Sequence, residues 1–120
     1  MPTLYHLPSC NTCQRVRAAL EPLASDWTLR DIKSAPLNES ELDRLAALAG
    51  GYAPLFSRRA QLYRQRNLKA QTLTEEDYRG LILEHYTFLS RPVVEVDGEV
   101  FVGSSKKAVE GAAAQLRAGA

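Results

Sequence analysis

The sequence is poor in several residue types: among 120 residues it has two cysteines, two histidines, one tryptophan and one methionine. Its formal net charge is only +1, so charge alone favours neither nucleic acid nor a membrane surface as a partner. No apolar run is long enough to cross a bilayer. The N-terminal residues lack the basic start and long apolar stretch of a signal peptide. We therefore expect one domain over residues 1–120, monomeric and cytoplasmic.

The two cysteines form a Cys-x-x-Cys motif, Cys10-Asn11-Thr12-Cys13, directly after the short apolar run 4–7. A strand, a tight turn at Pro8-Ser9 and a helix beginning near Cys13 would place Cys10 at a helix N-terminus. The free N–H groups and the helix dipole stabilise a thiolate there, and the thiolate is the nucleophilic form. In a reducing cytosol such a pair is more often catalytic, redox-sensing or metal-binding than a structural disulfide.

The alternatives for this pair are a zinc site and inert thiols. Zinc needs four ligands, and His6 and His85 offer no recognisable metal spacing, so no metal is expected. Structural roles are favoured for both histidines. We predict Cys10 as the nucleophile and Cys13 as the thiol that resolves the mixed disulfide.

Hydrophobic periodicity and turn signals predict the element order strand, helix, strand, several helices, β-hairpin and helix. The predicted strands cover residues 3–7, 27–32, 92–96 and 99–102, and the predicted helices cover 13–21, 38–50, 59–66, 74–85 and 105 onward. The first three elements form a parallel βαβ unit, and the late hairpin adds antiparallel strands. The expected fold class is therefore α/β, with a mixed sheet of about four strands and an all-helical insertion.

Local signals support several of these elements. Asn38 is predicted to cap a helix, with Glu41 as its reciprocal partner, and Thr74 to cap another. Asp97-Gly98 between two apolar runs is a strong hairpin signal. Leu48 and His85 are expected on buried helix faces, as is Ala19 in the first helix.

Four stretches of the chain, read together, resemble the arsenate reductase (ArsC)-type branch of the thioredoxin superfamily, which includes the Spx regulators. They are LYH through CNTC (4–13), PLFSRRAQLY (54–63), FLSRPVV (88–94) and DG through VG (97–103), in the family's order. The resemblance implies a thioredoxin-like sheet with a helical insertion and Cys10 as nucleophile. It also implies arginines that bind an oxyanion or stabilise the thiolate, beside a cis Pro92. Arg91 and Arg59 match these positions, with Arg58 as a competitor of Arg59. A guanidinium near Cys10 would lower the pKa of its thiol and hold an oxyanion or a glutathione carboxylate.

Two departures from the family pattern bear on activity. Arsenate reductases proper have one cysteine at this place, whereas this chain also has Cys13, as Spx proteins do. Their third arginine is missing: Gly103 is followed by two serines and then by Lys106 and Lys107, and lysine cannot offer a bidentate guanidinium. Arsenate reduction is thereby disfavoured.

The function predicted from these residues is thiol–disulfide oxidoreduction with no bound cofactor and with glutathione as co-substrate, or with glutaredoxin or thioredoxin as partner. One alternative is an Spx-like redox-sensing regulator that binds the RNA polymerase α subunit. Gly51 matches a glycine that Spx proteins use for that contact, although a glycine pair after a helix is also typical of a C-cap. The other alternative is a genuine arsenate reductase dependent on glutathione or glutaredoxin.

Overall fold

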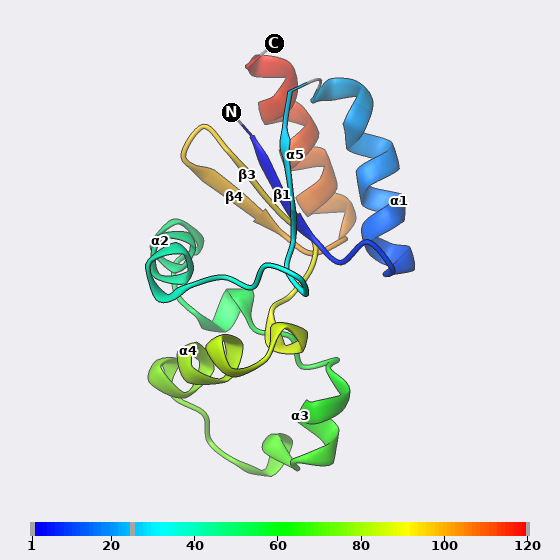
Figure 1. The fold of residues 1–120 in the computed structure, drawn as a ribbon. Coiled ribbons are helices and arrows are strands. Elements are labelled where there is room, and N and C mark those ends of the chain that lie inside the picture. The colour runs from blue at the N-terminus through cyan, green and yellow to red at the C-terminus, as the bar shows by residue number, and fades with distance from the viewer. Residues whose placement is uncertain (1, 25, 120) are drawn as a thin grey trace. The chain divides into compact units, whose positions relative to one another are not determined.

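The chain divides into two compact units. The computed structural model describes residues 2–24 and 26–119 (Figure 1). The sheet unit combines residues 1–35 with 91–120, and the helical unit is Pro36–Ser90. A single domain over residues 1–120 stays a prediction.

The sheet unit contains a four-stranded mixed sheet in the order β2-β1-β3-β4. The strands are β1 Thr3–His6, β2 Thr28–Asp31, β3 Val93–Val96 and β4 Glu99–Val102. β1 pairs with β2 in parallel, whereas β1–β3 and β3–β4 are antiparallel. This confirms the α/β class and the mixed sheet predicted from the element order.

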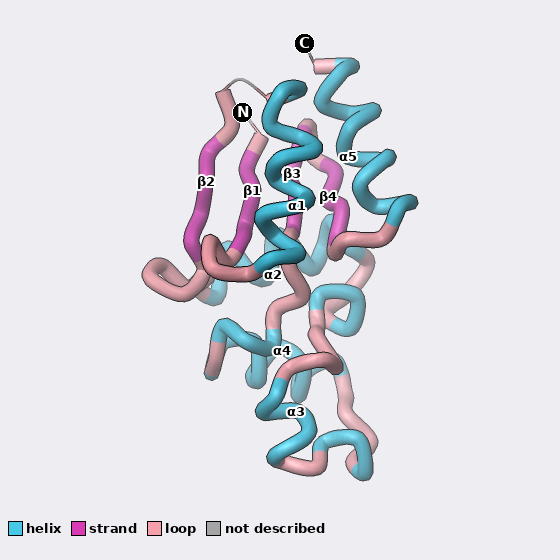
Figure 2. The backbone as a smooth tube through the Cα atoms, turned by 90° about the vertical axis from the view of Figure 1, so that its right-hand side faces the viewer, coloured by secondary structure: helices cyan, strands magenta, loops and turns pink. Residues whose placement is uncertain are grey.

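Two helices, α1 (Asn11–Leu20) and α5 (Lys106–Ala118), cover the same face of this sheet (Figure 2). Alternation along β1 and β3 turns Leu4, Val94 and Val96 toward these helices. There they join a buried cluster with Val16, Leu20, Ala112 and Leu116. Burying a side chain of this size contributes roughly 1.5–3 kcal/mol, so this cluster stabilises the sheet unit strongly.

α1 ends where the sequence predicts. Pro22 lies in the short 3₁₀ turn η1 (Glu21–Leu23), and its ring and missing N–H prevent the α-helix from continuing. The expectation for Ala19 is wrong, because this side chain is exposed while Val16 and Leu20 carry the contact.

The β3–β4 hairpin turns at Asp97 and Gly98, which have φ values of 50° and 77°. Two consecutive positive φ values are typical of a type I′ turn, whose twist matches that of paired strands. The turn predicted from Asp-Gly is thus confirmed.

The helical unit contains α2 (Glu39–Ala49), α3 (Gln61–Gln65) and α4 (Glu75–Glu84), with the 3₁₀ turns η2 (Ala53–Leu55), η3 (Leu68–Ala70) and η4 (Tyr86–Phe88). Both predicted caps are present as capping boxes. The Glu41 N–H donates to Asn38 Oδ1 at 2.8 Å, and the Asn38 N–H donates to Glu41 Oε1 at 3.0 Å. No helix among the described residues is both long and apolar enough to span a membrane.

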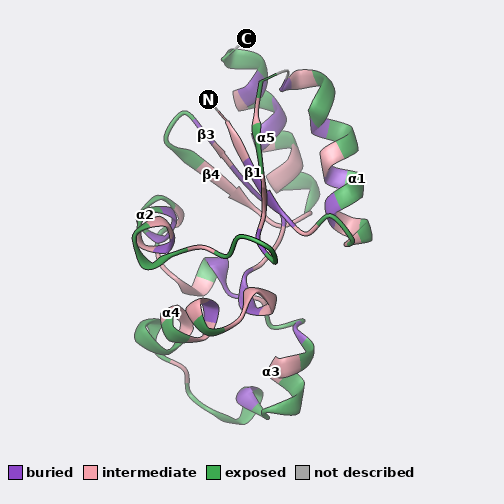
Figure 3. Ribbon diagram, viewed as in Figure 1, coloured by how far each residue is buried: buried purple, intermediate pink, exposed green. Residues whose placement is uncertain are grey.

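The structure corrects three expectations in this unit, two of which concern burial (Figure 3). The helix expected over 59–66 shortens to the five residues of α3. Leu48 is 39% exposed, because Leu42 and Leu45 already fill the contact face of α2. His85 lies just past the end of α4 and is half-buried, with its Nδ1 accepting from the Thr87 N–H at 3.0 Å.

An aromatic cluster fills the centre of the helical unit. Phe56 stacks on Phe88 with 5.5 Å between ring centroids, and Tyr63 and Tyr78 contact Phe56 from other sides. The segment after η2 is bridged to the end of the unit by backbone hydrogen bonds: the Ser57 N–H donates to the Phe88 carbonyl, and the Ser90 N–H donates to the Leu55 carbonyl. The insertion therefore has a core of its own.

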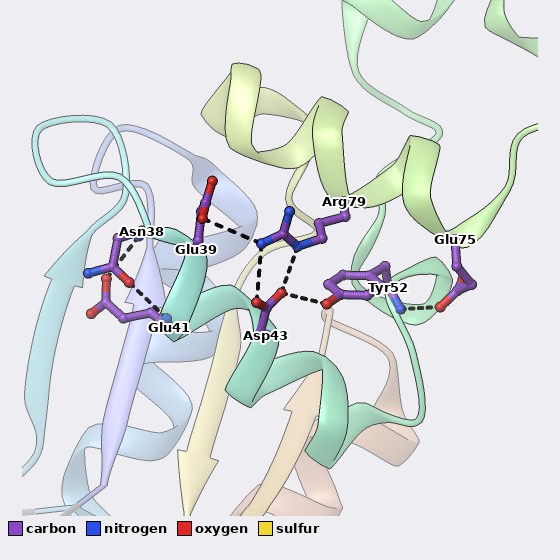
Figure 4. Close-up of polar contacts among 7 residues, drawn as sticks. All are labelled: Asn38, Glu39, Glu41, Asp43, Tyr52, Glu75 and Arg79. Carbon is purple, nitrogen blue, oxygen red and sulfur yellow. Dashed lines mark hydrogen bonds and ion pairs between the residues drawn. The ribbon is translucent and has the colours of Figure 1, made fainter.

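A polar network joins α2, α4 and the turn between them (Figure 4). The Arg79 guanidinium donates to both carboxylate oxygens of Asp43, at 2.8 and 3.2 Å, and lies 3.7 Å from Glu39. Tyr52 donates its hydroxyl to the same Asp43 carboxylate. Arg79, and then the Tyr52 hydroxyl, hold the pKa of Asp43 below its usual range, so this carboxylate stays charged and fixes the two helices together.

Candidate redox site

Cys10 lies where the turn after β1 meets α1. Its N–H donates to the Leu7 carbonyl at 2.9 Å, which closes the turn through Pro8 and Ser9. Its own carbonyl accepts from the Gln14 N–H at 2.9 Å, the first hydrogen bond of the helix. Cys10 is thus the N-cap residue of α1, with extended φ and ψ of −84° and 122°. The helix N-terminus predicted for Cys10 is confirmed.

The Cys10 thiol is partly exposed and its pKa is lowered. Partial burial acts in the opposite direction and is the largest single influence. Three influences together outweigh burial and lower the pKa. They are hydrogen bonds from the N–H and side chain of Cys13, a hydrogen bond from the Thr12 N–H, and the charge of Arg91. These are the stabilising groups expected for an anion at a helix N-terminus.

The Cys13 thiol is fully buried in the first turn of α1. Burial, together with the neighbouring Cys10, raises its pKa to about 11, although the Leu7 backbone and the charge of Arg91 act in the lowering direction. Both cysteines are free thiols in this structure. The two sulfurs are therefore unequal, because the Cys10 thiol is partly exposed with a lowered pKa, whereas the Cys13 thiol is enclosed and protonated at neutral pH.

Arg91 and Pro92 lie directly before β3 in the chain. The Arg91–Pro92 peptide bond is cis, as the resemblance implied, and the Pro92 carbonyl accepts from the Gly103 N–H at 2.8 Å. Arg91 is half-buried, and its charge favours the thiolate form of both cysteines. The structure thus brings Arg91 into electrostatic reach of the Cys-x-x-Cys pair.

Arg59 belongs to the helical unit, where its side chain is exposed and its N–H donates to Ser57 Oγ at 3.3 Å. Its predicted part in binding an oxyanion or glutathione stays a prediction. At the position of the family's third arginine, Ser105 caps α5 by accepting from the Ala108 N–H. Lys106 lies 3.9 Å from Glu110 on the exposed surface of the same helix.

His6 is buried, and a structural role is predicted for it from the sequence. It sits at the end of β1 opposite Asp31 in the register, and its carbonyl accepts from the Ile32 N–H at 3.0 Å. Burial lowers the pKa of His6, Arg17 lowers it further, and Asp31 partly opposes them. Among the described residues, no group of three or more His, Cys, Asp or Glu could hold a metal ion.

Comparisons with known proteins agree with this geometry. The chain matches the ArsC family over residues 5–112. It is 31% identical over 104 residues to the global transcriptional regulator Spx of Bacillus subtilis, covering 86% of this chain and 79% of that protein.

Solved structures place the fold in the same group. A possible arsenate reductase from Streptococcus mutans superposes with a TM-score of 0.75 at 28% identity, covering 92% of this chain and 96% of the other. An ArsC family related protein from Bacteroides fragilis gives a TM-score of 0.81 at 24% identity, covering 92% and 96%, a likeness of fold alone. The chain belongs to the ArsC family and has its thioredoxin-like fold.

Proposed function

We propose that this chain carries out thiol–disulfide exchange with Cys10 as the attacking thiol and Cys13 as the resolving thiol. The observation that supports this most is the inequality of the two sulfurs, one partly exposed with a lowered pKa and the other buried with a raised one. A nucleophile must be reachable and ionised, whereas a resolving thiol must stay out of the first step.

In the proposed reaction, the Cys10 thiolate attacks one sulfur of a substrate disulfide and forms a mixed disulfide, releasing the other substrate sulfur as a thiolate. That thiolate takes the proton of Cys13. Cys13 then attacks the Cys10 sulfur, which releases the second substrate thiol and leaves a Cys10–Cys13 disulfide. Two equivalents of a monothiol such as glutathione, or a dithiol carrier such as glutaredoxin or thioredoxin, supply the two electrons that restore the thiols.

Arg91 is proposed to stabilise the Cys10 thiolate and to hold an anionic part of the substrate, with Pro92 beside it. A glutathione mixed disulfide fits this role, because its carboxylates pair with guanidinium groups. Arg59 is proposed as a second carboxylate or oxyanion partner. No bound cofactor is part of the proposal.

The test is to measure the pKa of the Cys10 thiol by recording the ultraviolet absorbance of the thiolate as a function of pH. We expect a depressed pKa that rises in Arg91→Ala and recovers in Arg91→Lys, with Arg117→Ala on α5 as the control that leaves it unchanged. An ordinary pKa of about 8.5, unmoved by Arg91→Ala, would contradict the assignment of an activated nucleophile.

A second test traps the intermediate. Cys13→Ser protein incubated with oxidised glutathione should retain one glutathione on Cys10, detectable by mass, whereas wild type should proceed to the internal disulfide. If Cys13→Ser releases glutathione as fast as wild type, Cys13 is not the resolving thiol.

The similarity to Spx favours a second candidate, a redox-sensing regulator that binds RNA polymerase and responds to a Cys10–Cys13 disulfide. A pull-down with the C-terminal domain of the polymerase α subunit, with reduced and oxidised protein, distinguishes the two. Binding that depends on the redox state would favour the regulator. Turnover of disulfides without polymerase binding would favour the enzyme.

Genuine arsenate reduction is the third candidate, because a solved structure that is 28% identical to this chain is described as a possible arsenate reductase. Ser105 and Lys106 stand near the place of the third arginine and already have the roles of helix cap and surface ion pair. Arsenate-dependent consumption of glutathione would decide in its favour.

A further inference from the structure

The helical unit has a groove of about 390 Å³ beside α4, away from its aromatic cluster. Three leucines contributed by η3, the following segment and α4 form its apolar part: Leu68, Leu73 and Leu81. Three carboxylates of α4 border it: Glu76, Asp77 and Glu84. Pockets for small molecules commonly have volumes of about 300–1,000 Å³, so the groove is large enough to take one or two aliphatic side chains.

The groove is acidic although the whole chain is nearly neutral. Among the described residues that line it, none carries a positive charge. Glu84 is paired with Arg66, and Asp77 accepts from the Thr74 N–H within the capping box. All three carboxylates are exposed, so a cation reaching the groove would meet Glu76 and Asp77 beside an apolar floor, and would compete with Arg66 for Glu84.

Gly80 supplies a second observation. This glycine lies in the middle of α4, and neither its backbone conformation nor a close contact requires a glycine there. Its φ is ordinary, and a Cβ added to it would meet nothing within 4 Å. Gly111 in α5 is different, since the Phe101 ring lies 2.7 Å from where its Cβ would be. Glycine weakens a helix interior relative to alanine, so a glycine with no packing role carries a stability cost for α4. Gly80 lines the groove, and its missing side chain keeps the groove open.

We propose that this groove docks a partner protein through a basic segment that presents leucine-like side chains flanked by lysine or arginine. The apolar floor would accept the aliphatic groups, and the carboxylates of α4 would pair with the flanking cations. This inference is independent of the thiol site and goes beyond the proposed function, because it concerns which protein is recognised and not which bond is exchanged.

The test is a titration of ¹⁵N-labelled protein with a synthetic helical peptide carrying two leucines one turn apart and four flanking lysines. We expect amide shifts concentrated in residues 68–84. Gly80→Leu, which fills the groove, should weaken binding at least about tenfold, a loss of about 1.4 kcal/mol, without lowering the melting temperature. Gly80→Ala should have an intermediate effect on binding and should raise the melting temperature.

Charge variants complete the experiment. Glu76→Gln should weaken binding about threefold at low salt and less at high salt, whereas Glu110→Gln, a matched exposed carboxylate on α5, should change nothing. Cys10→Ser should bind the peptide as wild type does. The proposal is overturned if the peptide gives no shifts at millimolar concentration, if Gly80→Leu binds equally well, or if a peptide with glutamates in place of lysines binds as tightly. Shifts in the same residues that grow with protein concentration alone would assign the groove to a second copy of this chain instead.

Discussion

Replacing Gly51 by alanine should destabilise the protein more than the same replacement at its neighbour Gly50. Both glycines have positive φ, 139° and 87°. They differ in surroundings: a Cβ on Gly51 would lie 2.6 Å from Glu75 Oε1, whereas a Cβ on Gly50 would meet nothing within 4 Å. Gly50→Ala is therefore a matched control, because it adds only the free-energy cost of placing alanine in a backbone conformation with positive φ.

The magnitude follows from the contacts of Glu75. Its carboxylate accepts from the N–H groups of Tyr52 at 2.7 Å and Ala53 at 3.0 Å, and a Cβ at Gly51 would push it away. These bonds are exposed, so their joint loss costs about 1 kcal/mol. A left-handed backbone costs alanine about 1–2 kcal/mol at Gly50, and the rarer φ of Gly51 costs on the order of 2 kcal/mol. We expect a loss of about 3 kcal/mol for Gly51→Ala and about half that for Gly50→Ala.

The measurement is urea unfolding of both variants, alone and combined with Glu75→Ala. Because Glu75→Ala removes the carboxylate that collides, Gly51→Ala should cost less in that background, while Gly50→Ala should cost the same. Equal costs for the two glycines in both backgrounds would refute the reasoning. The result also bears on the regulator hypothesis, since a Gly51 variant that fails to bind polymerase must first be shown to be folded.

Three further predictions concern the thiols, pH and helix capping. Iodoacetamide should alkylate native wild-type protein at Cys10 only, because Cys13 is buried and protonated, and mass mapping that finds equal labelling would contradict this. Since burial lowers the folded pKa of His6 below the unfolded value of about 6.5, the melting temperature should fall as pH drops from about 7.5 to 5.5, and less so in His6→Asn. Asn38→Ala should lose about 1 kcal/mol of unfolding free energy, whereas Asn38→Asp, which keeps an accepting oxygen, should not.

The parts of the fold that sequence predicted well are those set by neighbours in the chain. A capping box needs only Asn38 and Glu41 at the right spacing, and a type I′ turn needs only residues that tolerate positive φ, such as Asp97 and Gly98. The same holds for the strand, turn and helix around Cys10. Each of these features depends on residues within about four positions of one another, so the local sequence is sufficient to predict it.

The parts that sequence missed depend on residues far apart. Periodicity predicts the centre of a buried helix face but not its width. It therefore predicts burial for Ala19 and Leu48, which are exposed at the edges of their helix faces. Pairing of Arg79 with Asp43, and the reach of Glu75 to the turn after α2, require the helix packing itself. The raised pKa of Cys13 likewise follows from burial that only the folded sheet unit creates.

The unequal thiols also order the steps of the proposed reaction. In the reduced protein, the Cys10 side chain and its negative charge help to raise the pKa of Cys13, while Arg91 lowers it. Once Cys10 is held in a mixed disulfide, its negative charge is gone, whereas the charge of Arg91 remains. The Cys13 pKa should then fall, so the resolving thiol ionises more easily only after the first attack has occurred. Such an order would keep Cys13 from competing for substrate, since burial still shields it from every disulfide except the one formed on Cys10.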